Sequence, residues 1–241
     1  MRINRFLARS GVSSRRHADE LIVQGRVRVN GQIIRQLGIQ VDESNDVVQV
    51  DGKVVSPVKG MYYIMLNKPV GYLVSAADPH HERLVTSLLG DFKGKVFPVG
   101  RLDQNSSGLL VFTNDGPLAF RLSHPRYNVK KTYEATCRGS IADSALAQLS
   151  DGILLDDGPT APAEVKALKK SSESSVVRIT VHEGRKRQVR RMFDKVGFPV
   201  TRLKRIAYGP LGLGNLAEGA FIRLSQDQVK SLMIEVGILN G

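Results

Sequence analysis

The chain has 241 residues, of which 41% are hydrophobic, and its formal net charge is +12 at pH 7. This length allows one large or two smaller domains with a proper core, and no run of 18 apolar residues predicts a membrane span. The single cysteine, Cys137, excludes an internal disulfide framework and, with a basic start that leads into no apolar segment, predicts a cytoplasmic protein. The positive charge favours a polyanionic partner, either RNA, DNA or an anionic membrane.

Two short helices are predicted at the N-terminus. Apolar residues at helical spacing within residues 1–10 predict the first helix, which Gly11 ends. The pair Ser13-Ser14 then offers N-caps for a second helix. Arg15 and Arg16 occupy its first turn, where their charges oppose the helix dipole. A phosphate bound at that helix end would remove the conflict.

A basic hairpin follows these helices. In RVRVNGQII (26–34) valines alternate with arginines, and Asn30-Gly31 is a strong hairpin signal. Pro and Gly within residues 52–60 then mark a domain boundary. We therefore expect one domain over residues 1–58 and a second over residues 59–241.

The arginines of the first domain cluster on one side, which argues against a merely solvated cationic face. An amphipathic membrane helix would need a larger apolar face than this segment offers. The candidates for RNA contact here are Arg2, Arg5, Arg9, Arg15, Arg16, Arg26 and Arg28.

The second domain alternates strands with irregular segments and a few helices. Strands are predicted over residues 61–66, 109–113, 132–137 and 175–182, and a helix over residues 141–150. This pattern predicts an α+β domain with a mixed, mainly antiparallel sheet.

A second basic block covers residues 182–205, which hold nine Lys or Arg and two acids. Val189, Met192, Phe193 and Val196 stand at helical spacing and predict a helix. Arg190 lies on the border of that apolar stripe, where an arginine can turn into a crevice beside the core. We therefore expect Arg190 to partner a semi-buried carboxylate, and the other cations of the block to meet phosphate.

Several kinds of chemistry have no motif in this chain. There is no P-loop, no GxGxxG, no GxSxG elbow and no HExxH. The pair His80-His81 lacks the Cys or carboxylate pattern of a metal site. No metal and no cofactor are therefore expected.

Asp103 lies in PVGRLDQNSSGLLVFTNDG (98–116), inside an otherwise apolar stretch. Alone, an aspartate before Gln-Asn-Ser-Ser-Gly is typical of a turn or cap. With its neighbours, however, GRLD resembles the motif that carries the catalytic aspartate of bacterial ribosomal RNA pseudouridine synthases of the RsuA/RluB type.

The resemblance covers nearly all of the chain. SRRHADELIVQGRVRVNG is similar to an S4 RNA-binding domain, and LNKPVG (66–71) to the first motif of the catalytic domain. KKTY (130–133) matches the segment with the active-site tyrosine, and EGRKRQVRRM (183–192) the segment with the active-site basic residue. LKR (203–205) resembles the hydrophobic element near the target base. An S4-like α/β domain followed by a pseudouridine synthase catalytic domain is therefore expected.

This resemblance implies a reaction without cofactor or metal. Asp103 would be the nucleophilic or proton-abstracting carboxylate, with addition to the base and attack at C1′ both open. Arg190 would orient that carboxylate and hold it ionised. Tyr133 would stack on the base and could serve in proton transfer at C5. Leu203 would close the apolar side, and Arg101 could fill the space left by a flipped uridine.

The expected partner is ribosomal RNA, free or within a pre-ribosomal particle, with no membrane and no obligate protein partner. Residues 151–165 and LKRIAYGPL are closest to large-subunit members, which would place the target in 23S rRNA near the peptidyl-transferase centre. The alternatives are a 16S rRNA target and a non-catalytic RNA-binding factor of ribosome assembly. The remaining candidates for RNA contact are Lys68, Arg185, Lys186, Arg187, Arg191, Lys204 and Arg205.

Overall fold

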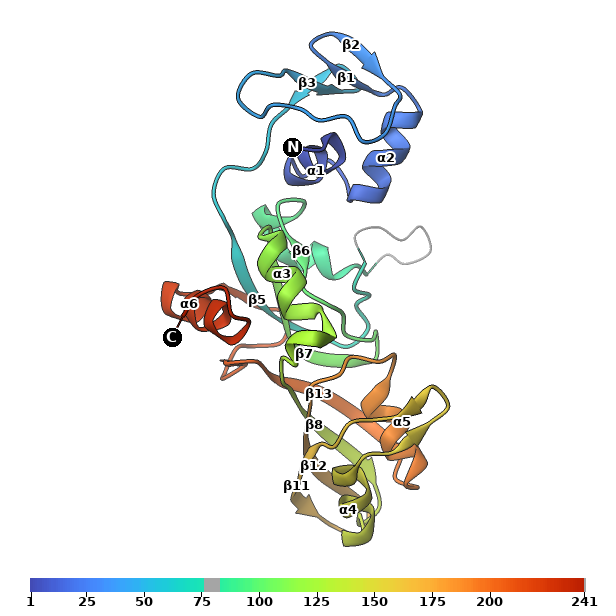
Figure 1. The fold of residues 1–241 in the computed structure, drawn as a ribbon. Helices are drawn as coiled ribbons and strands as arrows, with labels where there is room; N and C mark the ends of the chain where they lie inside the picture. Colours follow the sequence, from blue (N-terminus) through green and yellow to red (C-terminus); the bar gives the residue numbers. More distant parts are fainter. Residues whose placement is uncertain (76–82, 241) are drawn as a thin grey trace. The chain divides into compact units, whose positions relative to one another are not determined.

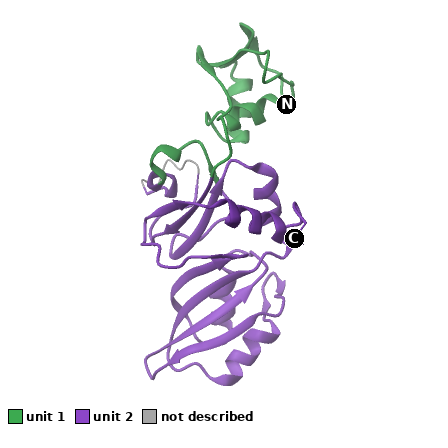
Figure 2. Cartoon of the chain, turned by 90° about the vertical axis from the view of Figure 1, so that its left-hand side faces the viewer, with its two compact units in different colours: residues 1–62, 89–97 green, residues 63–88, 98–241 purple. Residues whose placement is uncertain are grey.

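The computed structural model describes residues 1–75 and 83–240. The chain folds into two compact units (Figure 2). Unit 1 contains residues 1–62 and 89–97, and unit 2 contains residues 63–88 and 98–241. The pair His80-His81, for which no metal site was predicted, lies outside the described residues. No helix of the described residues is long and apolar enough to span a bilayer.

Unit 1 begins with the two predicted helices. These are α1 (Ile3–Arg9) and α2 (Arg15–Val23), and the Ser14 side chain accepts a hydrogen bond from the His17 N–H as the cap of α2. A small antiparallel sheet in the order β2-β1-β3-β4 covers them (Figure 1). Its strands are β1 (Val27–Val29), β2 (Gln32–Ile34), β3 (Val48–Val50) and β4 (Lys53–Val55).

The β1–β2 hairpin forms as the sequence predicts. Asn30 and Gly31 both have positive φ values, 50° and 82°, as a two-residue hairpin turn with the twist of the strands requires. The apolar faces of both helices and of the sheet enclose a separate core that includes Phe6, Ile22 and Val27. The module is therefore a helix pair on a sheet with its own hydrophobic cluster.

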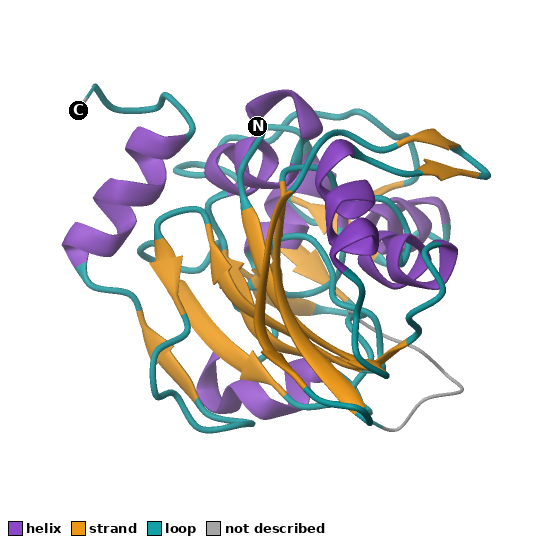
Figure 3. Cartoon of the chain, turned by 90° about the horizontal axis from the view of Figure 1, so that it is seen from below, coloured by secondary structure: helices purple, strands orange, loops and turns teal. Residues whose placement is uncertain are grey.

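Unit 2 is built on a large mixed sheet (Figure 3). Its strands follow the order β11-β12-β8-β13-β7-β5-β15, and β14 pairs with β13. The pair β13–β7 is parallel, and the antiparallel pairs are β11–β12, β12–β8, β8–β13, β13–β14, β7–β5 and β5–β15, which confirms the predicted α+β class. The strands are β5 (Tyr63–Lys68), β6 (Phe97–Pro98), β7 (Ser106–Thr113), β8 (Lys131–Arg138), β11 (Glu164–Lys170), β12 (Ser174–Val181), β13 (Val200–Tyr208), β14 (Leu211–Gly212) and β15 (Phe221–Arg223).

Helices cover the sheet in two groups. The helix α4 (Asp143–Asp151) and the helix α5 (Gln188–Lys195) pack on the half with β8 and β12, where Leu149, Phe193 and Val177 share one core. The helices α3 (Gly116–Ser123) and α6 (Gln226–Glu235) cover the half with β5 and β7. The remaining elements are the 3-10 segments η1 (Val85–Phe92) and η2 (Pro125–Tyr127) and the hairpin β9 (Leu154–Leu155)–β10 (Gly158–Pro159).

The parallel pair β7–β13 requires a glycine at one position. Leu203 lies opposite Ser106 and Arg205 opposite Gly108 in this pair. Gly108 has φ +107°, and a Cβ there would lie 2.2 Å from the Arg205 carbonyl oxygen. Only a residue without a side chain lets β13 approach β7 this closely. The close approach brings the start of β7 beside the middle of β13.

Candidate active site

A cavity of about 490 Å³ opens in unit 2. Its walls come from residues 99–106, from β8, from residues 183–189 and from β13. Four of the five residues predicted for catalysis and for the base pocket line it together, namely Arg101, Asp103, Tyr133 and Leu203. Segments far apart in the sequence therefore converge on Asp103.

A tight turn positions Asp103. The Asp103 carbonyl oxygen accepts a hydrogen bond of 3.0 Å from the Ser106 N–H, and β7 starts at Ser106. The bend is therefore limited to Gln104 and Asn105, and Gly108 already belongs to β7. The carboxylate is half-buried, and no described residue forms a hydrogen bond or ion pair with it. It is available to a substrate in the cavity.

Lys68 fixes this turn from the interior. Its side chain is 0% exposed, and its Nζ donates to the carbonyl oxygens of Pro69 (2.9 Å), Ser106 (2.7 Å) and Gln104 (3.4 Å). Burial lowers the pKa of Lys68 to about 8, against the opposing effect of the nearby Asp103. The expectation that Lys68 meets an RNA phosphate is therefore wrong, because three backbone carbonyls occupy its buried ammonium group.

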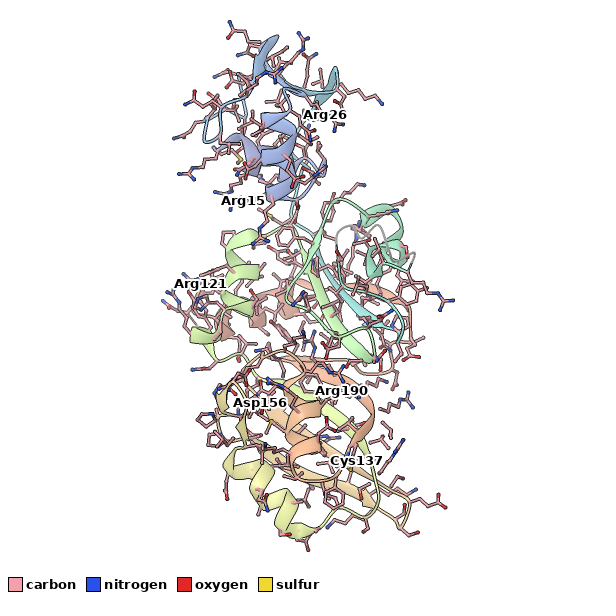
Figure 4. The ribbon with its side chains drawn as sticks, turned by 90° about the vertical axis from the view of Figure 1, so that its right-hand side faces the viewer. Arg15, Arg26, Arg121, Cys137, Asp156 and Arg190 are labelled. Atoms are coloured by element: carbon pink, nitrogen blue, oxygen red, sulfur yellow. The ribbon has the colours of Figure 1, made fainter. Side chains whose placement is uncertain are left out.

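Arg190 fixes the turn from the side of α5. As the border position predicted, its side chain turns inward and is only 7% exposed (Figure 4). Its guanidinium donates to the carbonyl oxygens of Asn105 (2.7 Å) and Val200 (2.9 Å). Burial lowers the pKa of Arg190, and the nearby Asp103 raises it. Arg190 thus lies close enough to Asp103 to act on it electrostatically, but its hydrogen bonds go to the backbone.

The sheet places Tyr133 and Leu203 on the cavity wall. Tyr133 of β8 pairs with Ile179 of β12 and Arg205 of β13. Leu203 pairs with Ala135 of β8 on one side and with Ser106 of β7 on the other. The pairing of the strands therefore places the half-buried Tyr133 ring and the buried Leu203 side chain at the cavity wall. The same pairing places Ser106, the first residue of β7, beside Leu203.

The loop before α5 is tied to the β9–β10 hairpin (Figure 4). Arg185 donates to the carbonyl oxygens of Gly158 (3.0 Å) and Pro159 (2.6 Å) and pairs with Glu183 (2.9 Å). Arg191 makes a bidentate ion pair with Asp157, at 3.0 and 2.9 Å. Arg185 and Arg191 were expected to meet phosphates, but these contacts within the chain occupy both guanidinium groups.

Lys186 and Arg187 differ from these two arginines. Both side chains are exposed, both line the cavity, and neither has an ion pair or side-chain hydrogen bond with a described residue. Arg187 adopts a left-handed conformation with φ 52° and precedes α5. The expectation of phosphate contact stays a prediction for these two residues.

Two further cations, the buried Arg205 and the half-buried Lys131, line the cavity. Arg205 is 3% exposed, and its Nε donates to the Leu109 carbonyl oxygen at 2.7 Å. Lys131 donates to the carbonyl oxygens of Val129 and His182, both at 2.9 Å, and burial lowers its pKa to about 8. The guanidinium of Arg205 stacks on the Tyr208 ring, 5.0 Å from its centroid. Arg205 is therefore a buried strand residue and not the surface phosphate contact that was expected.

The other candidates for RNA contact lie mostly at the surface. Lys204 is half-buried on β13. In unit 1, Arg9 pairs with Glu43 at 3.0 Å and Arg26 with Asp51 at 2.6 Å. The side chains of Arg2, Arg5, Arg15, Arg16 and Arg28 are exposed.

Sequence reasoning missed several residues of the cavity wall. Lys131 belongs to the KKTY segment, two residues before Tyr133, so its place at the cavity could have been predicted from the sequence. Gln188 donates to Glu183 at 2.7 Å and shapes the loop between them, but no spacing pattern indicates this pair. The further missed residues include Gln104 and Tyr208.

Comparison with known proteins assigns the chain to a family. The model of the RNA pseudouridylate synthase family matches residues 62–195. The chain belongs to that family. The S4 domain model matches residues 1–48, so the chain is an RNA isomerase with an N-terminal S4 domain.

Individual relatives in this family align over almost the whole chain. An uncharacterized RNA pseudouridine synthase of Aquifex aeolicus is 44% identical, over 99% of this chain and 96% of the relative. The ribosomal large subunit pseudouridine synthase B of Bacillus subtilis is 41% identical, over 96% of this chain and 95% of the relative. A crystal structure of a pseudouridylate synthase aligns with a TM-score of 0.70 and 30% identity, over 96% of this chain and 99% of that one.

Proposed function

We propose that this pseudouridine synthase isomerises one uridine of 23S ribosomal RNA near the peptidyl-transferase centre, and that Asp103 is its catalytic carboxylate. One observation supports the aspartate above all. Its half-buried carboxylate, free of partners among the described residues, shares a cavity with an aromatic ring and a buried leucine. A turn held by Lys68 and Arg190 sets its position.

The reaction requires few groups. The N1–C1′ bond breaks, the uracil rotates, a bond forms between C5 and C1′, the C5 proton leaves, and N1 takes up a proton. Asp103 acts as the nucleophile, on C1′ or on the base. The Tyr133 ring stacks on the uracil and serves in proton transfer at C5. Leu203 excludes water from the apolar side of the base.

The surrounding cations have separate roles in this proposal. Arg190 orients the turn through the Asn105 carbonyl and places a positive charge near Asp103. Arg101 is exposed at the cavity and enters the space that the flipped uridine leaves. Flipping costs a few kcal/mol, which base stacking and phosphate contacts offset. Lys186 and Arg187 supply such contacts at the cavity entrance.

The choice of 23S RNA rests on the relatives. The protein of Bacillus subtilis that is 41% identical is named for the large ribosomal subunit. We therefore expect the substrate in the large-subunit RNA, either free or within a pre-ribosomal particle, and a cytoplasmic site of action.

The test is tritium release from rRNA labelled with 5-³H-uridine. The wild-type protein is expected to release tritium from 23S RNA and not from 16S RNA. Asp103→Asn, which keeps the size of the side chain, is expected to release none while binding RNA normally. Asp151→Asn, at an exposed position on α4, is the matched control and should retain full release.

Three outcomes would contradict parts of this proposal. No release by the wild-type protein on either RNA would favour a non-catalytic RNA-binding factor. Equal release by Asp103→Asn would remove Asp103 from the chemistry. Release from 16S RNA alone would move the substrate to the small subunit.

A further inference from the structure

Residues 89–97 fold with the S4 domain, although strands of unit 2 flank them in the sequence. They belong to unit 1, as their colour in Figure 2 shows. Leu89 and Val96 are buried, and the Phe92 ring packs edge-on against Tyr62 with 5.4 Å between centroids. This segment is therefore a packed part of the RNA-binding unit and not a free loop.

The tip of this segment touches the turn between α1 and α2. A Cβ on Gly11 would lie 2.6 Å from the Gly94 carbonyl oxygen, so the two backbones are in direct contact. The Lys93 N–H donates to Gly90 O and the Lys95 N–H to Phe92 O, which closes the turn around Gly94. Two glycines thus bring an inserted loop against the helix pair.

Four exposed cations lie within a few residues of this contact in the sequence. Lys93 and Lys95 flank Gly94, and neither amino group pairs with a described residue. Arg15 and Arg16 lie in the first turn of α2, four and five residues after Gly11; Figure 4 labels Arg15. At no more than about 3.6 Å per residue, their Cα atoms lie within roughly 18 Å of Gly11.

The charges of these residues are largely uncompensated. Asp91 is the one acid within residues 89–97. The first turn of α2 contains no acid, so the two arginines face the positive end of the helix dipole. Arg9 differs from these four cations, because Glu43 pairs with it. Surplus positive charge on a surface favours a partner with several negative groups.

We propose that Lys93 and Lys95 form, with Arg15 and Arg16, a composite basic surface that binds the phosphate backbone of the RNA substrate. The identity of the RNA rests on the proposed function, but the surface itself does not. The inserted loop thereby adds two phosphate contacts that the S4 domain lacks in its own N-terminal segment.

The test measures RNA affinity against salt concentration for Lys93→Ala/Lys95→Ala in the full chain. Each lost phosphate contact lowers the slope of log K against log salt by about 0.7 for single strands and 0.9 for duplex. The double variant should therefore show a slope smaller by about 1.4–1.8. Its loss of affinity should be about 7- to 12-fold greater at 50 mM than at 200 mM salt. The probes are transcripts of 23S and 16S rRNA.

Lys166→Ala/Lys169→Ala is the matched control. Both lysines are exposed on β11 of unit 2 and are expected to leave the slope unchanged. Unchanged affinity of the Lys93/Lys95 variant at 50 mM salt would overturn the proposal, as would an equal effect of the control pair. If alanine lowers the melting temperature, Lys93→Gln/Lys95→Gln gives the decisive measurement.

Tritium release separates this proposal from the proposed function. The Lys93/Lys95 variant should retain the wild-type rate once the RNA is saturated with protein, since neither lysine lies in the catalytic cavity. If the wild-type protein binds RNA but releases no tritium, the proposed function fails. The salt slopes then still test whether the composite basic surface binds RNA phosphates.

Discussion

Lys68 is the residue with the greatest difference between its expected and its observed role. Its ammonium group lies 2.7 Å from the Ser106 carbonyl oxygen, behind the turn that carries Asp103. A buried donor shared by three carbonyls stabilises one conformation of that turn, because removing it leaves acceptors without partners. The residue therefore acts on the site through the backbone.

Lys68→Met is expected to flatten the dependence of stability on pH. The pKa of Lys68 is about 8 in the folded protein and about 10.4 in an unfolded chain. Between these pH values the unfolded state binds more protons, so the free energy of unfolding of the wild-type protein rises with pH. Without Lys68 this rise should be smaller by roughly 1–3 kcal/mol. Urea unfolding at pH 7, 8.5 and 10 measures it.

Lys166→Met, at an exposed position on β11, is the control for this experiment. It should reproduce the pH profile of the wild-type protein. Parallel profiles for the wild-type protein and Lys68→Met would contradict the lowered pKa of Lys68 in the folded protein.

Substitution of Arg185 should lower stability, whereas substitution of Arg187 should weaken RNA binding. Arg185→Ala leaves carbonyl oxygens of the β9–β10 hairpin without a donor and should cost about 1–3 kcal/mol of stability. Arg187→Ala removes an exposed side chain and should leave stability unchanged. It should instead lower the salt slope of RNA binding by about 0.7–0.9. Identical effects of both variants in urea unfolding and in RNA titration would argue against this division.

At the scale of residues, the sequence predicts the direction of a side chain where that direction depends only on the residue's position on its own helix. The border position of Arg190 predicted its inward turn, and the structure confirms it. The burial of Lys68 and Arg205 could not be predicted in this way. The carbonyl oxygens of Ser106 and Leu109, which accept from Lys68 and Arg205, lie on β7, distant in sequence, and no spacing pattern encodes such acceptors. The catalytic roles of Asp103, Tyr133 and Arg190 stay predictions.

At the scale of elements, local chemistry predicted the N-terminal module well. The Ser14 cap and the Asn30-Gly31 turn are short-range signals, and both elements form as expected. Several elements of unit 2 were missed. Helix α3 was not predicted, although the Asp115 carboxylate accepts the Leu118 N–H and caps it. Polar and apolar residues do not alternate regularly along β13, because Arg205 occupies a buried position among apolar residues.

Gly108→Ala should break the contact between β7 and β13. The new Cβ would lie 2.2 Å from the Arg205 carbonyl oxygen, so the strands must separate. A loss of at least about 3 kcal/mol in urea unfolding is expected. Gly139→Ala is the matched control, with φ +76° but open space around the new methyl group, and should cost only about 1 kcal/mol. Equal costs would show that backbone strain alone, and not the close approach, requires Gly108.

At the scale of the whole molecule, the two units contain separate hydrophobic clusters. The cores of unit 2 contain no residue before Tyr63, and the core of unit 1 contains none after Val55. The sequence placed a domain boundary at residue 58 from its Pro and Gly content. It gave no sign that residues 89–97 would join unit 1, because that assignment depends on contacts between distant segments.

Deletion of residues 1–58 is expected to weaken RNA binding more than it disturbs the catalytic fold. The deletion removes seven candidate arginines and leaves both cores of unit 2 intact. It also removes the part of unit 1 with which residues 89–97 fold, including Gly11 beside Gly94, so the melting temperature should fall by several degrees. Circular dichroism and RNA titration measure the two effects. Loss of cooperative unfolding in the shortened protein would contradict independent folding of the catalytic part.

The position of β13 between β8 and β7 has a consequence for synthesis of the chain. Ribosomes make β7 and β8 first, and both strands keep an open edge until residue 208 has left the exit tunnel. Exposed strand edges pair readily with other chains, so nascent protein at this stage depends on protection by chaperones. Translation products that stop before β13 would contain Asp103 but no cavity around it. Activity is therefore confined to chains whose synthesis is nearly complete.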